Sequence, residues 1–129
     1  MFQRVIMIDD NEADNVFHQL VLEEAGFAGP IQVFELGAPA VAALAADPDL
    51  RSVLVLLDLN LPGLDGWEVA RRLAPHLARR PHALVILTSS PNPDDRDHAH
   101  TIPQIQELLT KPLEVEDARR LLAGEGPAR

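Results

Sequence analysis

Short apolar runs alternate along the chain with longer segments in which apolar residues recur at helical spacing. Apolar runs of this length predict buried strands, whereas apolar residues three or four positions apart predict amphipathic helices. The predicted strands are 5–8, 31–34, 53–57, 83–87 and 105–110. The predicted helices are 11–25, 39–46, 67–77, a short one beginning near Asp94, and a last one marked by Val115, Ala118, Leu121 and Leu122. Strand–helix units joined by right-handed crossovers predict an α/β fold with a doubly wound parallel sheet.

The third run, 53–57, is the most informative of these segments. Its five consecutive apolar residues are too few for a helix that buries every face, and they suit a central parallel strand covered on both sides. The run stops at Asp58, and residues 59–66 are rich in turn formers. Because ligands bind beyond the carboxyl ends of strands in open α/β sheets, Asp58 is a candidate reactive group. A lone Asp at this place would otherwise start a turn or cap a helix.

Other predicted strands end in polar residues that suit the same chemistry. Asp9 and Asp10 follow the first strand, Thr88 the fourth and Lys111 the fifth, so all are expected at one sheet edge with Asp58. Carboxylates ~4 Å apart repel by ~4 kcal/mol at an effective dielectric of ~20, and a hard cation such as Mg²⁺ would neutralise them. A lysine can pair with an aspartate and then with phosphoryl oxygens, and a threonine hydroxyl can donate a hydrogen bond to them. The set therefore predicts an acyl-phosphate site.

Composition limits the class of protein. The 129 residues suffice for one domain with a real core, expected over 1–123 and followed by a tail over 124–129. No apolar run approaches a membrane span, the N-terminus leaves no room for a signal peptide, and there are no cysteines. These features predict a cytoplasmic location and no membrane partner. The net charge of −9 argues against direct binding to nucleic acid, and Lys111 is the only lysine among 11 basic residues.

With these strand ends, the chain resembles the receiver domain of two-component response regulators, from Arg4 to about Leu122. Each element of the resemblance is common by itself, and the ordered set is specific. The set consists of Asp9-Asp10, Asp58 with Pro62-Gly63 and Asp65-Gly66 behind it, Thr88-Ser89, and Lys111-Pro112. The resemblance implies a five-stranded flavodoxin-like sheet with strand order 2-1-3-4-5.

The resemblance also implies a role for each acidic residue of the site. Asp58 would be the phosphoacceptor. Asp10 and Asp58 would bind Mg²⁺ together with the main-chain carbonyl of Asn60, and Asp9 would assist through water. The implied chemistry is phosphotransfer and autodephosphorylation within a signalling domain, rather than turnover by an enzyme.

Residues in and after the fourth and fifth strands show both the family pattern and two departures from it. Thr88 would sense the phosphoryl group and Lys111 would contact it, and the bond from Lys111 to Pro112 is often cis in receivers. Leu108 stands where receivers usually carry an aromatic ring that swings inward on activation, so a swinging-ring switch is not expected. Ser89 replaces the usual Ala or Gly after the switch hydroxyl and is expected to narrow access to the site.

The function predicted from the sequence is that of a single-domain response regulator. It is expected to accept phosphate from a phosphohistidine on a histidine kinase or phosphotransfer protein. Its output would be partner binding, self-association or phosphorelay. A homodimer is expected at least when the protein is phosphorylated, through the last helix and the neighbouring strand or helix face. Segments 9–14 and 88–95 are similar to stand-alone receivers paired with phytochrome-type or hybrid sensor kinases.

Two other classes fit part of the pattern. A haloacid-dehalogenase-like phosphatase also uses an Asp after an apolar strand, but it needs a second acid where Asn60 stands and usually a cap. A flavodoxin-like flavin carrier needs a Ser/Thr/Gly-rich loop after the first strand, where acidic residues 9–12 would repel a flavin phosphate. Turnover of a phosphate ester, or a yellow chromophore, would separate these classes from a receiver.

The remaining features are assigned structural roles. Trp67 is expected to pack at the start of a helix. Asp97, His98 and His100 lack a further ligand in the sequence and are expected to form solvated surface rather than a metal site. The arginines near the third helix are expected to face solvent: Arg71, Arg72, Arg79 and Arg80. Part of the apolar stripe on the first helix, where kinases dock on receivers, is expected to pack in the core: Phe17, Leu20 and Val21.

Overall fold

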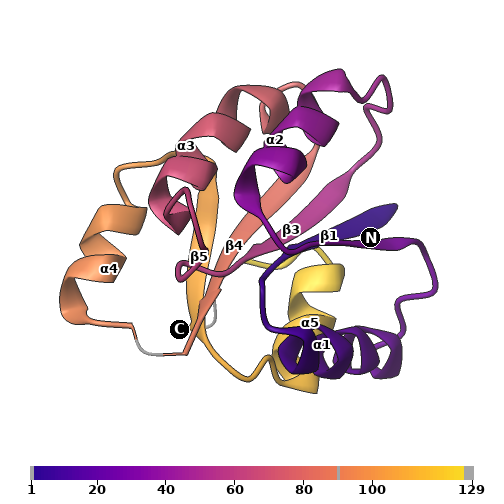
Figure 1. The fold of residues 1–129 in the computed structure, drawn as a ribbon. Helices are drawn as coiled ribbons and strands as arrows, with labels where there is room; N and C mark the ends of the chain where they lie inside the picture. Colours follow the sequence, from indigo (N-terminus) through magenta and orange to yellow (C-terminus); the bar gives the residue numbers. More distant parts are fainter. Residues whose placement is uncertain (1, 90, 127–129) are drawn as a thin grey trace.

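The computed structural model describes residues 2–89 and 91–126, and a strand is followed by a helix throughout (Figure 1). The elements are β1 (Arg4–Ile8), α1 (Glu12–Glu24), β2 (Ile31–Phe34), α2 (Gly37–Ala46), β3 (Val53–Leu57), α3 (Gly66–Leu77), β4 (His82–Thr88), α4 (Pro93–Ala99), β5 (Ile105–Thr110) and α5 (Val115–Leu122). The strands pair in parallel in one five-stranded sheet of order β2-β1-β3-β4-β5. The predicted doubly wound sheet and its strand order are therefore confirmed.

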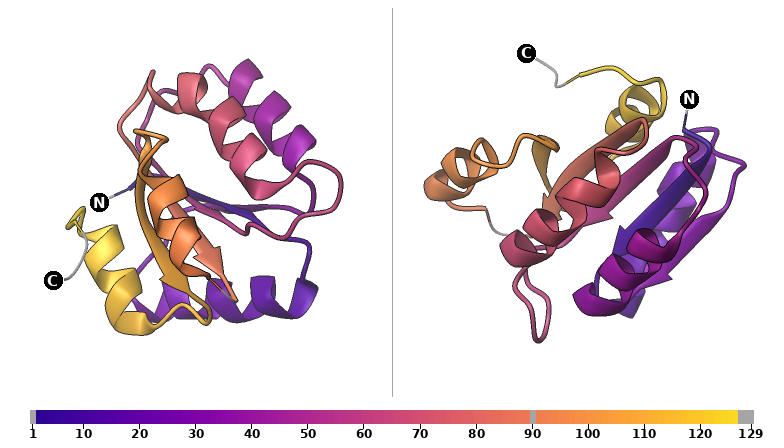
Figure 2. Two further views of the ribbon diagram at one scale, coloured as in Figure 1. Left: turned by 90° about the vertical axis from the view of Figure 1, so that its left-hand side faces the viewer. Right: turned by 90° about the horizontal axis from the view of Figure 1, so that it is seen from above.

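The sheet is covered on both faces. Helices α2 and α3 lie on one face, α1 and α5 lie on the other, and α4 lies beside β5 (Figures 1 and 2). In β3, Val53, Val55 and Leu57 pack in the core toward α2 and α3, while Leu54 and Leu56 pack in the core toward α1 and α5. Alternate residues of a strand point to opposite faces, so a wholly apolar strand serves both cores.

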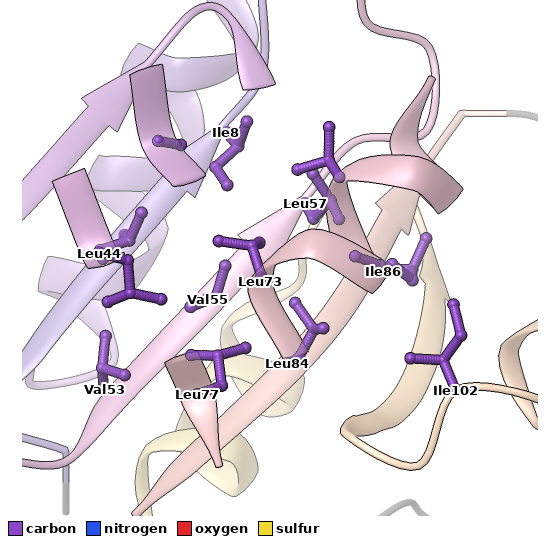
Figure 3. Close-up of a cluster of buried hydrophobic side chains, with 14 of the residues drawn as sticks. Ile8, Leu44, Val53, Val55, Leu57, Leu73, Leu77, Leu84, Ile86 and Ile102 are labelled. Atoms are coloured by element: carbon purple, nitrogen blue, oxygen red, sulfur yellow. The ribbon is translucent and has the colours of Figure 1, made fainter. Parts of the chain in front are cut away.

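Figure 3 shows the core between the sheet and helices α2 and α3. Leu44 of α2 and Leu73 of α3 lie over the apolar side chains of β3 and β4, and Ile102 closes the core near β5. Each of these side chains is at most 5 % exposed. Burial of one such side chain stabilises the fold by about 1.5–3 kcal/mol, so this packing fixes the strands whose ends carry the polar residues.

The element boundaries agree with the predictions to within two residues wherever both ends were predicted. Pro75 lies inside the last turns of α3. The helix nevertheless continues to Leu77, as predicted, and the N–H of Ala78 donates to the carbonyl of Ala74 at 3.0 Å. A proline in the last turns of a helix removes a single hydrogen bond, and the buried Leu73 and Leu77 hold the turn against the core.

The predicted domain boundary at residue 123 falls just after α5, and its use as a domain limit stays a prediction. Residues 127–129 of the predicted tail, and Ser90 of the segment 88–95, lie outside the described residues. In the part of the chain that the structure describes, no helix is long and apolar enough to cross a membrane.

One of the arginines expected in solvent is buried. Arg80 is 4 % exposed, and its Nη1 donates to the carbonyl of Asp49 at 2.9 Å. Arg4 donates to the same carbonyl at 3.1 Å and pairs with the carboxylate of Asp47. The prediction for Arg80 was wrong because the turn before β3 presents the carbonyl of Asp49 as an acceptor for its guanidinium. We call the charged residues at or just before the amino ends of β1, β3 and β4 the amino-edge cluster: Arg4, Asp47, Asp49, Arg51 and Arg80.

The loop after β3 is held tightly against the end of that strand. A Cβ at Gly66 would lie 2.5 Å from the Cα of Leu59 and 2.8 Å from the carbonyl oxygen of Asp58. Only glycine therefore allows α3 to begin at this distance from the strand. The N–H of Gly66 donates to the carbonyl of Leu59 at 3.0 Å, which closes the loop and fixes the backbone around Asp58.

Candidate functional site

The predicted site residues lie at the carboxyl edge of the sheet because strand pairing continues past the strand ends. The N–H of Asp58, just after β3, donates to the carbonyl of Ile8 in β1 at 2.9 Å. The N–H of Lys111, just after β5, donates to the carbonyl of Thr88 in β4 at 2.8 Å. The parallel register therefore brings together groups that are distant in the sequence.

Three carboxylates form a cluster at this edge. Asp9, Asp10 and Asp58 each offer an oxygen, and these oxygens lie within 4.8 Å of one another. Asp9 and Asp58 are 5 % and 6 % exposed, whereas Asp10 is exposed. Opposite ligands of an octahedral Mg²⁺ ion lie about 4.2 Å apart, so all-oxygen donors at this spacing fit the ion after a small movement. The exposed side at Asp10 is where the waters that Mg²⁺ retains could lie.

Backbone hydrogen bonds orient the two buried carboxylates. Asp9 Oδ1 accepts from the N–H of Asn11 at 2.9 Å, and Asp58 Oδ1 accepts from the N–H of Asn60 at 3.2 Å. Each carboxylate thus starts a turn with one oxygen and presents Oδ2 toward Lys111. Asp58 is therefore both the turn starter and the candidate reactive group. The proposed use of the Asn60 carbonyl as a metal ligand stays a prediction.

The ammonium of Lys111 lies among the carboxylates. Its Nζ is 2.7 Å from Asp9 Oδ2, 2.8 Å from Asp14 Oδ2 and 3.3 Å from Asp58 Oδ2. Burial lowers the pKa of Lys111, but the hydrogen bonds to Asp14 and Asp9 outweigh burial and raise the pKa overall. Burial also raises the pKa of Asp9, and the hydrogen bond from Lys111 offsets only part of that rise. Lys111 is thus a permanent cation beside Asp58.

Sequence reasoning gave no role to Asp14 at this site. Asp14 lies in the first turn of α1, where the side chain of Asn11 caps the helix by accepting from the N–H of Asp14 at 3.0 Å. The sequence did contain a signal for this role. Asp14 lies in a helix that begins just after Asp10, so its side chain is close to the same sheet edge. Acidic residues are common in first helical turns because they favour the helix dipole, so the signal was ambiguous.

Helix α1 holds the segment that carries the lysine by a second contact. His18 is 2 % exposed, and its Nε2 accepts from the N–H of Leu113 at 3.2 Å. Burial lowers the pKa of His18, which keeps the ring neutral and able to accept at Nε2. The peptide bond between Lys111 and Pro112 is cis, as the family resemblance led us to expect.

Thr88 lies at the end of β4 and is 2 % exposed, whereas Ser89 is exposed. Thr88 lines a cavity of about 360 Å³ between the loops after β3 and β4. The other lining residues are Leu59, Asn60, Asp65, Trp67, Asn92 and Asp95. The cavity gives the region beside Thr88 a polar approach from solvent. Restriction of that approach by Ser89 stays a prediction.

Helix α4 is attached to α3 near this cavity. The ring of Trp67 stacks on that of His98, with centroids 4.1 Å apart and planes 17° from parallel. Trp67 packs at the start of α3 as predicted, and His98 belongs to this contact rather than to open surface. Leu108, at the position of the usual aromatic switch, is 5 % exposed and lies in the core.

The apolar stripe on α1 divides into two parts. Val21 is 5 % exposed and packs in the core, as expected for part of the stripe. Val16, Phe17 and Leu20 are 54 %, 48 % and 59 % exposed. We call these three side chains the α1 patch, and they line a shallow surface with residues of the first helical turn.

Comparison with known proteins gives a consistent result. The family described as response regulator receiver domain matches residues 5–123. A probable methanogenesis regulatory protein, FilR2 of Methanothrix harundinacea, is 33 % identical over 119 residues, which cover 90 % of this chain and 76 % of the relative. Response regulator Rcp1 of Synechocystis is 31 % identical over 126 residues, covering 93 % and 84 %. The phosphorylated cyanobacterial phytochrome response regulator RcpA has a TM-score of 0.74 and 28 % identity, covering 96 % and 91 %.

Proposed function

Because the chain belongs to the response regulator receiver family, we propose that it accepts a phosphoryl group on Asp58 in a Mg²⁺-dependent reaction. The donor is a phosphohistidine on a sensor histidine kinase or a phosphotransfer protein. Family membership separates the chain from the dehalogenase-like phosphatases and the flavin carriers. The observation that carries the proposal is the buried Asp58 beside two further carboxylates and the ammonium of Lys111.

The residues of the site have separate tasks in this reaction. An Asp58 oxygen attacks phosphorus, and the P–N bond to the donor imidazole breaks as the O–P bond forms. Lys111 donates to a phosphoryl oxygen, and the Thr88 hydroxyl donates to another. Water later attacks phosphorus, which releases inorganic phosphate and restores the Asp58 carboxylate. Positioning and charge stabilisation supply most of the rate enhancement in phosphoryl transfer.

The carboxylate cluster would hold the metal. Asp10, Asp58 and the main-chain carbonyl of Asn60 are the proposed ligands, and Asp9 would assist through water. A bound Mg²⁺ would supply positive charge beside the phosphoryl oxygens. The exposure of Asp10 supports this assignment because a hydrated ion can reach it from solvent.

The proposal extends to partners. The α1 patch supports docking of a kinase or phosphotransfer protein because its three apolar side chains lie about two to three helical turns beyond Asp10. The similarity to RcpA, a phytochrome response regulator, supports a phytochrome-type kinase as the donor protein. The same proposal covers the output, which is partner binding, phosphorelay or a homodimer through α5. It also places the protein in the cytoplasm, with neither nucleic acid nor a membrane as a partner. Light scattering with and without phosphorylation tests the homodimer.

Labelling with a small donor tests the acceptor. Incubation with acetyl phosphate and Mg²⁺ should add one phosphoryl group per chain, stable in acid and labile in base, as intact-protein mass spectrometry can measure. Asp58→Asn should abolish the added mass because an amide is a poor nucleophile. Asp94→Asn, at an exposed residue of α4, is the matched control and should be labelled fully. Full labelling of Asp58→Asn would refute the assignment.

A further inference from the structure

The three N–H groups of the Lys111 ammonium have carboxylate partners of unequal distance. The contacts to Asp9 and Asp14 are 2.7 and 2.8 Å, and the contact to Asp58 is 3.3 Å. Asp9 belongs to the carboxylate cluster that fits a metal ion, whereas Asp14 lies outside that cluster. Asp14 is therefore the carboxylate that serves the lysine alone.

A second group on α1 lies one turn beyond Asp14 and holds the same segment by its backbone. His18 follows Asp14 by four residues, so the two side chains lie on the same helix face. His18 accepts from the N–H of Leu113, and Leu113 is 2 % exposed in the core. Pro112 has no N–H to donate, so the contacts at Lys111 and Leu113 hold the two ends of this short segment.

We propose that Asp14 and His18 are positioning residues for Lys111 in phosphotransfer to Asp58. Asp14 orients the ammonium, and His18 fixes the backbone that carries it. Ordering a free lysine side chain costs about 2 kcal/mol of rotamer entropy. Contacts that already order the side chain in the resting protein reduce the entropy cost of the reaction itself. The inference rests on the proposed function because it concerns the same acceptor.

The three donors of the ammonium define what changes during the reaction. When the O–P bond forms at Asp58 and the donor's bond to phosphorus breaks, the N–H that faced Asp58 moves to a phosphoryl oxygen. The N–H groups toward Asp9 and Asp14 keep their partners, and no proton leaves the ammonium. Asp14 thus holds Lys111 at the site in the resting and the phosphorylated states.

A spectroscopic test is available because Lys111 is the only lysine of the chain. The NMR spectrum of unphosphorylated protein labelled with ¹³C and ¹⁵N in lysine should show the ammonium signal of one lysine side chain. In the wild type, its shift should differ from that of a flexible lysine, as expected for a fixed ammonium. Asp14→Asn should move the signal toward the flexible position, and Asp14→Glu should restore part of the shift. Glu24→Gln, exposed at the far end of α1, should leave the signal unchanged.

A kinetic test uses acetyl phosphate, whose small size avoids the α1 patch. Asp14→Asn should slow the labelling of Asp58 about tenfold, because a less well oriented Lys111 ammonium makes a weaker charge-assisted contact with the phosphoryl oxygen in the transition state. Asp14→Glu should recover part of the rate, and Glu24→Gln should match the wild type. His18→Leu removes the acceptor for Leu113, whereas His18→Gln offers an amide oxygen at similar reach. The Gln variant should therefore retain more of the rate than the Leu variant.

The outcomes separate this inference from the proposed function. If the wild type is not labelled at Asp58, the proposed function fails, and the lysine signal still tests whether Asp14 fixes the ammonium. If Asp14→Asn leaves both the signal and the rate unchanged, or if Glu24→Gln slows labelling equally, the inference is overturned. Should His18→Leu fail to fold, His18→Gln and the Asp14 variants decide the result.

Discussion

The two edges of the sheet carry charged clusters that differ in their balance of positive and negative groups. At the carboxyl edge, one ammonium lies among the carboxylates of Asp9, Asp14 and Asp58, with Asp10 close by. The amino-edge cluster has three guanidinium groups and two carboxylates, and two of its arginines also donate to the carbonyl of Asp49. Negative charge is in excess at the first edge, while each carboxylate of the second edge has a cationic partner.

This difference supports a stabilising role for the amino edge and the proposed chemistry at the carboxyl edge. The guanidinium of Arg4 pairs with Asp47, and the hydrogen bond from Arg4 lowers the pKa of that carboxyl. Such contacts hold the chain turns before β1, β3 and β4 in one arrangement. The excess of carboxylates at the other edge costs stability by repulsion, and it leaves a place for a cation and a phosphoryl group.

The largest stability effect is expected at the amino edge. Arg4→Met keeps most of the apolar stem but removes the ion pair with Asp47 and the hydrogen bond to Asp49. The Arg4 side chain is 12 % exposed, so these contacts are partly shielded from water. The free energy of unfolding should fall by about 2 kcal/mol, as measured by urea denaturation.

Arg72→Met is the matched control for this loss. Arg72 pairs with Glu68 on the surface of α3, and its side chain is 53 % exposed. Exposed pairs of this kind contribute about 0.5 kcal/mol or less. Equal losses for the two variants would contradict the assignment of a stabilising role to the amino edge.

Magnesium should stabilise the carboxyl edge by a smaller amount. The native fold assembles the three carboxylates and the unfolded chain does not, so Mg²⁺ at ten times its dissociation constant should raise the free energy of unfolding by about 1.4 kcal/mol. Asp10→Asn should lose most of this gain. Asp47→Asn, at the amino edge, should respond to Mg²⁺ as the wild type does. Thermal unfolding in Mg²⁺ and in EDTA measures the stabilisation of each protein. If Mg²⁺ stabilises Asp10→Asn as much as the wild type, the metal assignment is refuted.

The fold followed from the sequence because its signals are periodic and local. The fully apolar β3 could only be a strand buried on both faces, and its end at Asp58 located the site. Parallel strands then required Asp9, Thr88 and Lys111 to lie at the same edge. These inferences did not depend on the orientation of individual side chains in the folded protein.

The interactions that sequence reasoning missed depend on side-chain directions across the fold. Arg80 is followed by Pro81 after a helix, which is a typical setting for an exposed arginine. Its burial depends on a carbonyl at Asp49 that only the folded turn presents. Asp14 and Lys111 are likewise 97 positions apart in the sequence. Their contact follows from the angle at which α1 leaves the end of β1.

The smallest expected effect concerns how phosphorylation is transmitted to α4. In α4, Ala99 is the buried residue, and the helix is held by the Trp67–His98 stack and by contacts with β5. Few buried contacts imply low local stability, so α4 should respond when its attachment changes. Leu108 is buried and has no polar tip, so it cannot report the state of the site by moving between core and solvent.

We expect the hydroxyl of Thr88 to carry the change. It should gain a charge-assisted hydrogen bond to a phosphoryl oxygen and draw the loop before α4 toward the site. Beryllofluoride, a mimic of the phosphoryl group, should therefore slow amide hydrogen exchange over residues 91–100 about threefold, or ~0.6 kcal/mol. Thr88→Ala should still be phosphorylated at Asp58 but should lose this protection. Ser89→Ala, which removes the neighbouring exposed hydroxyl, should retain it. An equal response in the wild type and Thr88→Ala would show that the change reaches α4 by another route.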